Sequence, residues 1–143
     1  MRPLPGLAAV CAALALAACG GGDDGDAADR DAFLRAADAN CRQRSERNRA
    51  RPSDELPGRW VDDFAAELAA QRKLGVPDDL RARWDTYLRE LGTFVTESRK
   101  LYDEEARRTG ESGTASAKAN RAGFLARKAA TDLGLATCGS QFS

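Results

Sequence analysis

Cysteine is the residue type in this chain with the most chemistry to offer. The 143 residues contain Cys11, Cys19, Cys41 and Cys138, and they contain no histidine. Without histidine there is no Ser-His-Asp or Cys-His catalysis and no His-ligated zinc or haem. We therefore expect no catalytic residue, no cofactor and no metal site, and we expect that the protein is not an enzyme.

The first cysteines belong to an apolar N-terminal segment. Met1-Arg2 supplies a positive start, and residues 4–18 are almost all apolar before the chain reaches Cys19. This segment is shorter than the about 20 residues that span a bilayer, so it fits the h-region of a secretory signal, with Cys11 inside it. Small residues directly before a cysteine give the sequence Leu16-Ala17-Ala18-Cys19.

This arrangement resembles the lipobox of bacterial lipoproteins. In that family the signal peptide is cut before the cysteine, and the cysteine sulfur carries a diacylglyceryl group. The resemblance implies that residues 1–18 are a signal peptide and that Cys19 is the lipid attachment site. It also implies anchoring to the extracytoplasmic face of the cell membrane. The alternative is an ordinary secretory signal that leaves Cys19 free.

A glycine- and aspartate-rich stretch follows the lipobox. Residues 20–29 have almost nothing to bury, which is typical of a flexible tether. We therefore divide the chain into a signal peptide (1–18), a lipidated cysteine with its tether (19–29) and one folded domain (30–143).

Cys41 and Cys138 remain as an even pair in the exported domain. Outside the cytosol such pairs are usually oxidised. A bridge would close a loop of 138 − 41 = 97 residues. The chain-entropy model puts the stabilisation from such a loop at up to about 4.7 kcal/mol. We predict a structural disulfide, with a metal or redox site as the alternative.

The surroundings of these two cysteines form a second resemblance. Asn40-Cys41, together with the segment Leu133-Gly134-Leu135-Ala136-Thr137-Cys138-Gly139, looks like a pattern of small actinobacterial lipoproteins that have no assigned activity. The resemblance implies a membrane-anchored helical domain and no particular chemistry.

A run of arginines follows Cys41. Its members are Arg42, Arg44, Arg47, Arg49 and Arg51, opposed only by Glu46. The run could contact anionic lipid headgroups or an acidic envelope protein. The interpretation that we favour is a solvated helix end, where cations favour the negative end of the helix dipole. It lacks interleaved aromatic residues, and the net charge of the chain is zero, so we expect no nucleic-acid binding.

Adjacent acidic residues occur at Asp62-Asp63, Asp78-Asp79 and Glu104-Glu105. Neighbouring side chains on a helix point about 100° apart, so none of these pairs is an acid–base dyad. We expect Asp78-Asp79 at a helix start and the other two pairs on the solvated surface. The larger aromatic residues fit a core, or alternatively a ligand pocket between helices. They are Trp60, Phe64, Trp84, Tyr87, Phe94 and Tyr102.

Helical spacing of apolar residues recurs along the folded part, and sustained strand-like alternation is absent. The pattern predicts helices over about 29–49, 59–74, 77–108 and 115–133, with a loop over 109–114. The clearest stripe is heptad-like and consists of Leu80, Trp84, Tyr87, Leu91, Phe94, Ser98 and Leu101. Gly134 fits the left-handed residue after the last helix, and Leu135 fits the hydrophobic contact of a Schellman motif. These elements predict an all-α fold, a four-helix bundle closed by the disulfide.

Composition is consistent with one membrane-attached domain. A mean hydropathy of −0.51 excludes a multi-span membrane protein. The expected tether carries four aspartates, and residues 30–143 carry 21 basic and 18 acidic side chains. We expect a non-catalytic interaction or accessory module. The alternative is a protein that holds a small apolar ligand or lipid between its helices. A closed aromatic core would favour the module, and an apolar cavity would favour the ligand binder.

Overall fold

The computed structural model describes residues 22–52, 58–103 and 107–140, with side chains from Asp29 onward. This part of the chain forms four long helices and no strand. They are α1 (Gly22–Ala50), α2 (Arg59–Gln71), α3 (Arg81–Lys100) and α5 (Glu111–Leu133), followed by the short α6 (Ala136–Ser140). The predicted all-α, four-helix architecture is confirmed. The predicted signal segment and Cys19 lie outside the described residues.

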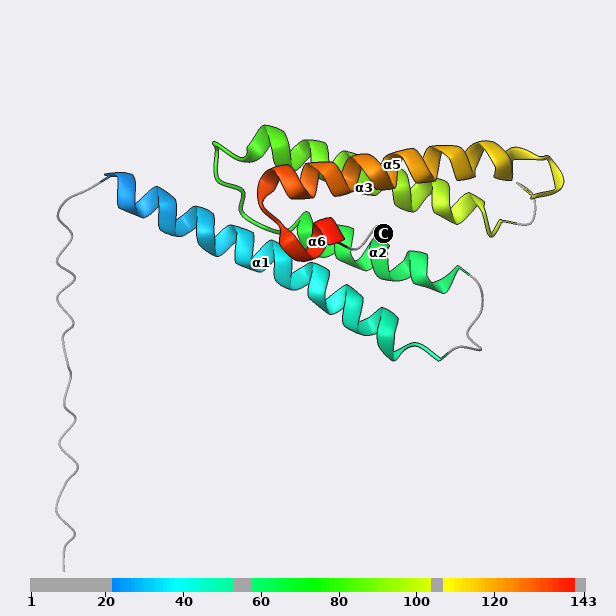
Figure 1. The fold of residues 1–143 in the computed structure, drawn as a ribbon, viewed down its shortest axis with the longest axis horizontal. Coiled ribbons are helices and arrows are strands. Elements are labelled where there is room, and N and C mark those ends of the chain that lie inside the picture. The colour runs from blue at the N-terminus through cyan, green and yellow to red at the C-terminus, as the bar shows by residue number, and fades with distance from the viewer. Residues whose placement is uncertain (1–21, 53–57, 104–106, 141–143) are drawn as a thin grey trace, which may run out of the picture.

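The long helices are arranged as two antiparallel pairs (Figure 1). One pair is α1 with α2, and the other is α3 with α5, which lie side by side for most of their length. Helix α2 also contacts α3 and so joins the two pairs. Helix α6 contacts both α5 and α1, so the C-terminal end of the described chain returns to the first helix.

Helices α3 and α5 bury side chains of different sizes. Helix α3 buries Trp84, Tyr87 and Leu91 of the predicted heptad-like stripe, and also Val95 beside it, whereas Phe94 of the stripe is only half-buried. Helix α5 presents mainly alanines, and small residues let two helices approach closely. Its buried residues are Ala115, Ala119, Ala122, Gly123, Ala126, Ala130 and Leu133.

Helix α1 begins earlier than the sequence predicted. It starts at Gly22, so residues 22–29 are helical instead of forming the flexible tether that we expected. Adding residues to an existing helix forms one hydrogen bond for each residue fixed, without a new nucleation cost. The packed part of α1 therefore supports its extension into a stretch of low intrinsic helix propensity.

Helices α3 and α5 also differ from prediction at their ends. Helix α3 begins at Arg81 rather than near Pro77, and it ends at Lys100 rather than near Arg108. At its C-terminal end the amides of residues 101, 102 and 103 donate to carbonyls three residues back, the tight 3₁₀ pattern that closes a helix. Helix α5 begins at Glu111 instead of Ala115, directly after Gly110, whose φ of 79° is left-handed.

The C-terminal end of α5 has the predicted Schellman geometry. Gly134 has a φ of 86°, its amide donates to the carbonyl of Thr131, and the amide of Leu135 donates to that of Ala130. Leu135 is 1% exposed. This turn directs the chain into α6, which the sequence pattern did not reveal. No helix among the described residues is both long and apolar enough to cross a membrane.

Candidate functional site

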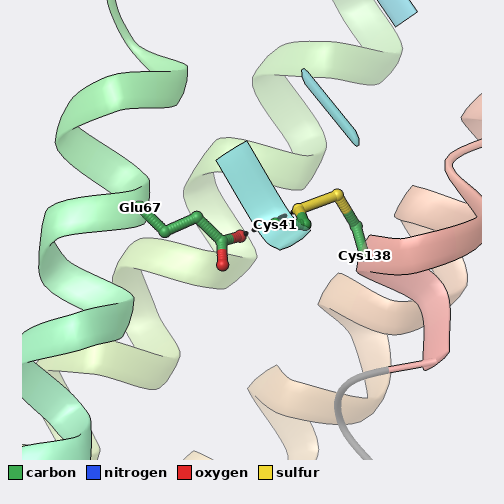
Figure 2. A group of neighbouring side chains, drawn as sticks. All are labelled: Cys41, Glu67 and Cys138. Atoms are coloured by element: carbon green, nitrogen blue, oxygen red, sulfur yellow. Dashed lines mark hydrogen bonds between the residues drawn. A yellow bond between two sulfur atoms is a disulfide. The ribbon is translucent and has the colours of Figure 1, made fainter. Parts of the chain in front are cut away.

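The predicted disulfide joins Cys41 on α1 to Cys138 on α6 (Figure 2). The two sulfur atoms are 1.95 Å apart and the two Cα atoms 5.3 Å apart. Both cysteines are fully buried. The bridge therefore lies inside the molecule, where it ties the first helix to the last.

A carboxylate lies beside this disulfide. Glu67 on α2 is 2% exposed, and its Oε1 is 3.3 Å from Sγ of Cys41 (Figure 2). The Nε of Arg44 donates to Glu67 Oε2 at 2.7 Å, and the hydroxyl of Tyr87 donates to Oε1 at 2.9 Å. Arg44 also lies over the ring of Phe64, with its guanidinium carbon 3.9 Å from the ring centroid. Residues of α1, α2 and α3 thus meet at one buried carboxylate.

Burial dominates the electrostatics of this cluster. It raises the pKa of Glu67 above the ordinary value of 4.5, although the charge of Arg44 and the donated hydrogen bonds oppose the change. Burial and the neighbouring Glu67 charge raise the pKa of Tyr87 well above its ordinary value of 10.0. Tyr87 is therefore a neutral donor at physiological pH, and the Arg44–Glu67 ion pair is one of the most fully desolvated contacts in the described chain.

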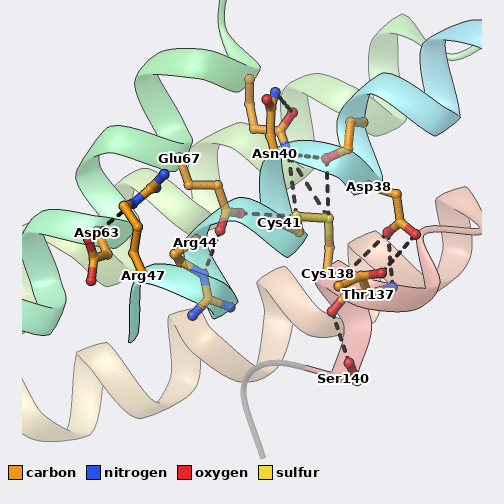
Figure 3. A network of polar contacts seen from close by, with 12 residues as sticks. Asp38, Asn40, Cys41, Arg44, Arg47, Asp63, Glu67, Thr137, Cys138 and Ser140 are labelled. Carbon is orange, nitrogen blue, oxygen red and sulfur yellow. Dashed lines mark hydrogen bonds and ion pairs between the residues drawn. A yellow bond between two sulfur atoms is a disulfide. The ribbon is translucent and has the colours of Figure 1, made fainter. Parts of the chain in front are cut away.

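Amide side chains complete the surroundings of the disulfide (Figure 3). The Nε2 of Gln71, a fully buried residue of α2, donates to the carbonyl of Ala37 at 3.0 Å and lies 3.4 Å from Sγ of Cys41. The Nδ2 of Asn40 donates to Gln71 Oε1 at 3.1 Å. Gln71 therefore satisfies its buried amide through two residues of α1, which fixes the register of α1 against α2.

Asp38 holds the beginning of α6 (Figure 3). Its carboxylate accepts hydrogen bonds from the backbone amide and the hydroxyl of Thr137, each at 2.9 Å, and from the amide of Cys138 at 3.4 Å. Asp38 thus acts as an N-cap supplied by a different helix. This contact orients α6 so that Cys138 faces Cys41.

The arginine run does not form a single surface. Arg44 is 2% exposed and ion-paired inside the molecule, so its predicted role in anionic-surface contact is wrong. Arg47 pairs with Asp63 on α2 at 3.2 Å, and Arg51 pairs with the same carboxylate. Arg44 and Arg47, three residues apart, lie on the side of α1 that faces α2, and Arg51 follows directly after the end of α1. Arg42 and Arg49 are exposed, and Arg42 lies 3.8 Å from Asp38.

The acidic pairs also separate. Asp63 is buried, contrary to the predicted solvated surface, because the arginines of α1 cover it. Its neighbour Asp62 is exposed, as are Asp78 and Asp79. Glu104-Glu105 lies outside the described residues. The sequence missed Glu67, Gln71 and Asp38 as members of the cluster. The position of Gln71 could have been predicted from the sequence. It continues the apolar stripe of α2 in steps of three and four residues from Val61, so its polar side chain is expected in the core.

Most of the aromatic residues singled out in the sequence pack between the helices, whereas Tyr102 is exposed. Trp84 packs edge-on against Phe33, and Tyr87 lies 5.2 Å from Trp84 between ring centroids. A second group comprises Trp60, Phe64, Phe94 and Tyr102, whose neighbouring rings are 4.9 to 6.2 Å apart. The predicted core interpretation is therefore confirmed for Trp84 and Tyr87, which are almost fully buried.

The cluster around the disulfide is suited to holding helices together. The two sulfurs and the Glu67 carboxylate lie within 4.8 Å of one another, a grouping that could hold a metal if both sulfurs were thiolates. In the disulfide the sulfurs are bonded to each other, and all three residues are buried.

The chain matches no family model, and no curated protein or solved structure matches it either.

Proposed function

We propose that this protein is a lipid-anchored envelope lipoprotein whose folded domain acts as a non-catalytic interaction or accessory module. The buried Cys41–Cys138 disulfide is the observation that carries the proposal. Such bridges persist in compartments outside the cytosol, where an export signal and lipobox would deliver the chain. The supporting sequence features are the apolar segment of residues 4–18 and Cys19 after it.

The burial of the polar cluster supports a role without catalysis. Glu67 and Tyr87, whose pKa values are raised, are 2% and 0% exposed. Glu67 accepts hydrogen bonds from both Tyr87 and Arg44. A general acid or base must reach a proton on its substrate. The contacts of this cluster are instead satisfied within the protein, as in a structural element.

The filled aromatic core favours an interaction module over storage of a ligand between the helices. Trp84 and Tyr87 lie between α1, α2 and α3, in contact with their neighbours. An apolar ligand between these helices would have to displace them, which would cost the free energy of their burial. The module would therefore bind partners through its outer surface, where Arg42 and Arg49 remain available for anionic groups.

The anchor can be tested through Cys19 and a matched cysteine. Two acyl chains, at about 0.8 kcal/mol per buried methylene, give stable membrane attachment. Cys19→Ala should move the protein from the detergent phase to the aqueous phase in phase partitioning. Cys11→Ala alters a cysteine of the same apolar segment and should leave the protein in the detergent phase. A Cys19→Ala chain that stays in the detergent phase, or a processing step insensitive to globomycin, would refute lipidation.

A further inference from the structure

A surface groove runs between α2 and α3. It has a volume of about 600 Å³ and is open to solvent. Leu68 and Val95 are buried residues of its lining, and Ala65 and Leu88 are half-buried. The groove therefore has an apolar floor between polar edges that include Thr93 and Thr96. Its volume is within the range of about 300–1,000 Å³ typical of small-molecule sites.

The rim of this groove is basic. Arg72, Arg89 and Arg99 line it and are exposed, and the lining contains one acidic residue, Glu97, which pairs with Lys100 at 3.0 Å. Arg89 pairs with Glu90 and Arg99 with Asp62, but these arginine side chains are 64% and 58% exposed. Exposed ion pairs contribute little free energy, so an anionic ligand can exchange with them. The positive rim is complementary to an anionic group.

Gly92 keeps the middle of the groove open. It lies inside α3, where glycine costs about 1 kcal/mol relative to alanine. A Cβ at this position would be 3.7 Å from the Arg72 guanidinium and 3.7 Å from Leu68, which is ordinary van der Waals contact. Helix packing does not require a glycine here. A larger side chain at position 92 would extend into the groove.

We propose that this groove binds an anionic amphiphile, a single acyl chain that ends in a phosphate or carboxylate head. The chain lies on Leu68, Val95 and Leu88, and the head is bound by Arg72 with Arg89. Guanidinium groups bind both head types through paired charge-assisted hydrogen bonds. This binding activity goes beyond the accessory role proposed above, and it does not depend on lipidation of Cys19.

The test is calorimetric titration of the full chain, with each amphiphile below its micelle concentration. The anionic probes are lysophosphatidylglycerol and a long-chain fatty acid, and the zwitterionic comparison is lysophosphatidylcholine. We expect saturable one-to-one binding of an anionic probe and at least about tenfold weaker binding of lysophosphatidylcholine, since one charge-assisted contact corresponds to about one decade in Kd. Binding of only one anionic probe identifies the head group, phosphate or carboxylate.

Two matched pairs of variants locate the site. Gly92→Leu should abolish binding, whereas Gly113→Leu, at a helical glycine with nothing within 4 Å of an added Cβ, should not. Arg72→Gln should weaken binding about tenfold, whereas Arg121→Gln removes the same charge from the exposed surface of α5 and should have no effect. The N-terminal end of the protein is the same in all these variants, so any amphiphile that binds there is subtracted.

The variants also provide the contradicting results. Both leucine variants should keep the helical content of the parent protein and should melt at the same temperature or a higher one, because glycine is unfavourable inside a helix. A folded Gly92→Leu protein with unchanged affinity would overturn the proposal. Equal loss in Arg72→Gln and Arg121→Gln would overturn it too, as would equal affinity for the anionic and zwitterionic probes. If Gly92→Leu does not fold, the arginine pair decides the question alone. Loss of the lipid anchor in Cys19→Ala would leave these titrations unchanged.

Discussion

The α3–α5 pair and the α1–α2–α6 assembly are stabilised by different kinds of interaction. Between α3 and α5, large apolar side chains of one helix meet alanines of the other. Among α1, α2 and α6, the decisive contacts are the Cys41–Cys138 disulfide, the Arg44–Glu67 ion pair and the Asp38 cap. The first region depends on apolar packing and the second on particular polar and covalent partners.

This difference affects how each region tolerates change. Dispersion and burial are distributed over many contacts, so an apolar interface loses stability in proportion to the change in volume. A buried polar network loses much more when one member is removed, because the remaining charge is left without a partner. The α1–α2–α6 assembly should therefore be the more sensitive of the two.

Removal of the disulfide should have the largest effect. Replacing Cys41 and Cys138 together by alanine should lower the free energy of unfolding by up to about 4.7 kcal/mol, because the unfolded chain loses a 97-residue loop constraint. Urea unfolding of the full chain measures this, and reduction of the parent protein should give a similar change. As a control, the double alanine variant should show no further change under reducing conditions, because it has no bridge left to reduce. A loss below about 1 kcal/mol, the scale of one ordinary hydrogen bond, would show that the bridge is not the main connection.

Breaking the buried ion pair should come next. Glu67→Ala leaves Arg44 charged and unpaired inside the protein, and we expect a loss of about 3–4 kcal/mol in the same urea experiment. Replacing both partners by apolar residues, Arg44→Met with Glu67→Leu, should recover most of that loss. A double variant as unstable as Glu67→Ala would show that the unpaired charge of Arg44 is not the main cause of the lost stability.

The apolar interface should respond more mildly. Ala126 is fully buried where α5 faces α3, and Ala126→Leu should cost about 1–3 kcal/mol through overpacking. Ala117→Leu, on the exposed side of the same helix, should change stability by less than about 0.5 kcal/mol. Thermal unfolding of the two variants measures the contrast. Equal effects would show that α3 and α5 are not closely packed at this point.

The smallest expected effect is a pH dependence that only the polar region should show. Because burial raises the folded-state pKa of Glu67, the folded protein binds a proton there more tightly than the unfolded chain. That contribution to stability is fully present below pH 4.5 and is lost as the pH rises through the folded-state pKa. The stability of the parent protein relative to Glu67→Gln should therefore fall as the pH increases above 4.5. A difference between the parent protein and Glu67→Gln that is flat or rises with pH would contradict this prediction. The difference in stability between the parent protein and Ala126→Leu should not change with pH, because both proteins contain Glu67.

The sequence predicted the apolar region well because its information is local. The spacing of Trp84, Tyr87 and Leu91 defines one face of a helix, and Gly134 with Leu135 defines a helix end. These features depend on neighbours within a few residues. The disulfide was also predictable, because only Cys41 and Cys138 remain once Cys11 and Cys19 are assigned to the predicted signal peptide and lipid site.

The polar region could be predicted only in part. The side chain of Glu67 meets Arg44 and Tyr87, which are 23 and 20 residues away in the chain, and Asp38 meets Thr137, 99 residues away. Nothing in their local sequence distinguishes them from surface residues, so the arginine run was interpreted as one surface. The sequence also did not predict the helical start of α1. Residues 22–29 have low helix propensity, and they are helical because they extend a helix that is already packed against the rest of the protein.

Non-reducing peptide mapping by mass spectrometry, on the mature protein isolated from the membranes of its own organism, tests most directly whether this is an exported, lipid-anchored and disulfide-closed module. We predict a mature chain that begins at Cys19 with a diacylglyceryl group, and a peptide in which Cys41 is linked to Cys138. A chain that retains residues 1–18, together with free thiols at Cys41 and Cys138, would contradict both the proposed export and the closure of the fold.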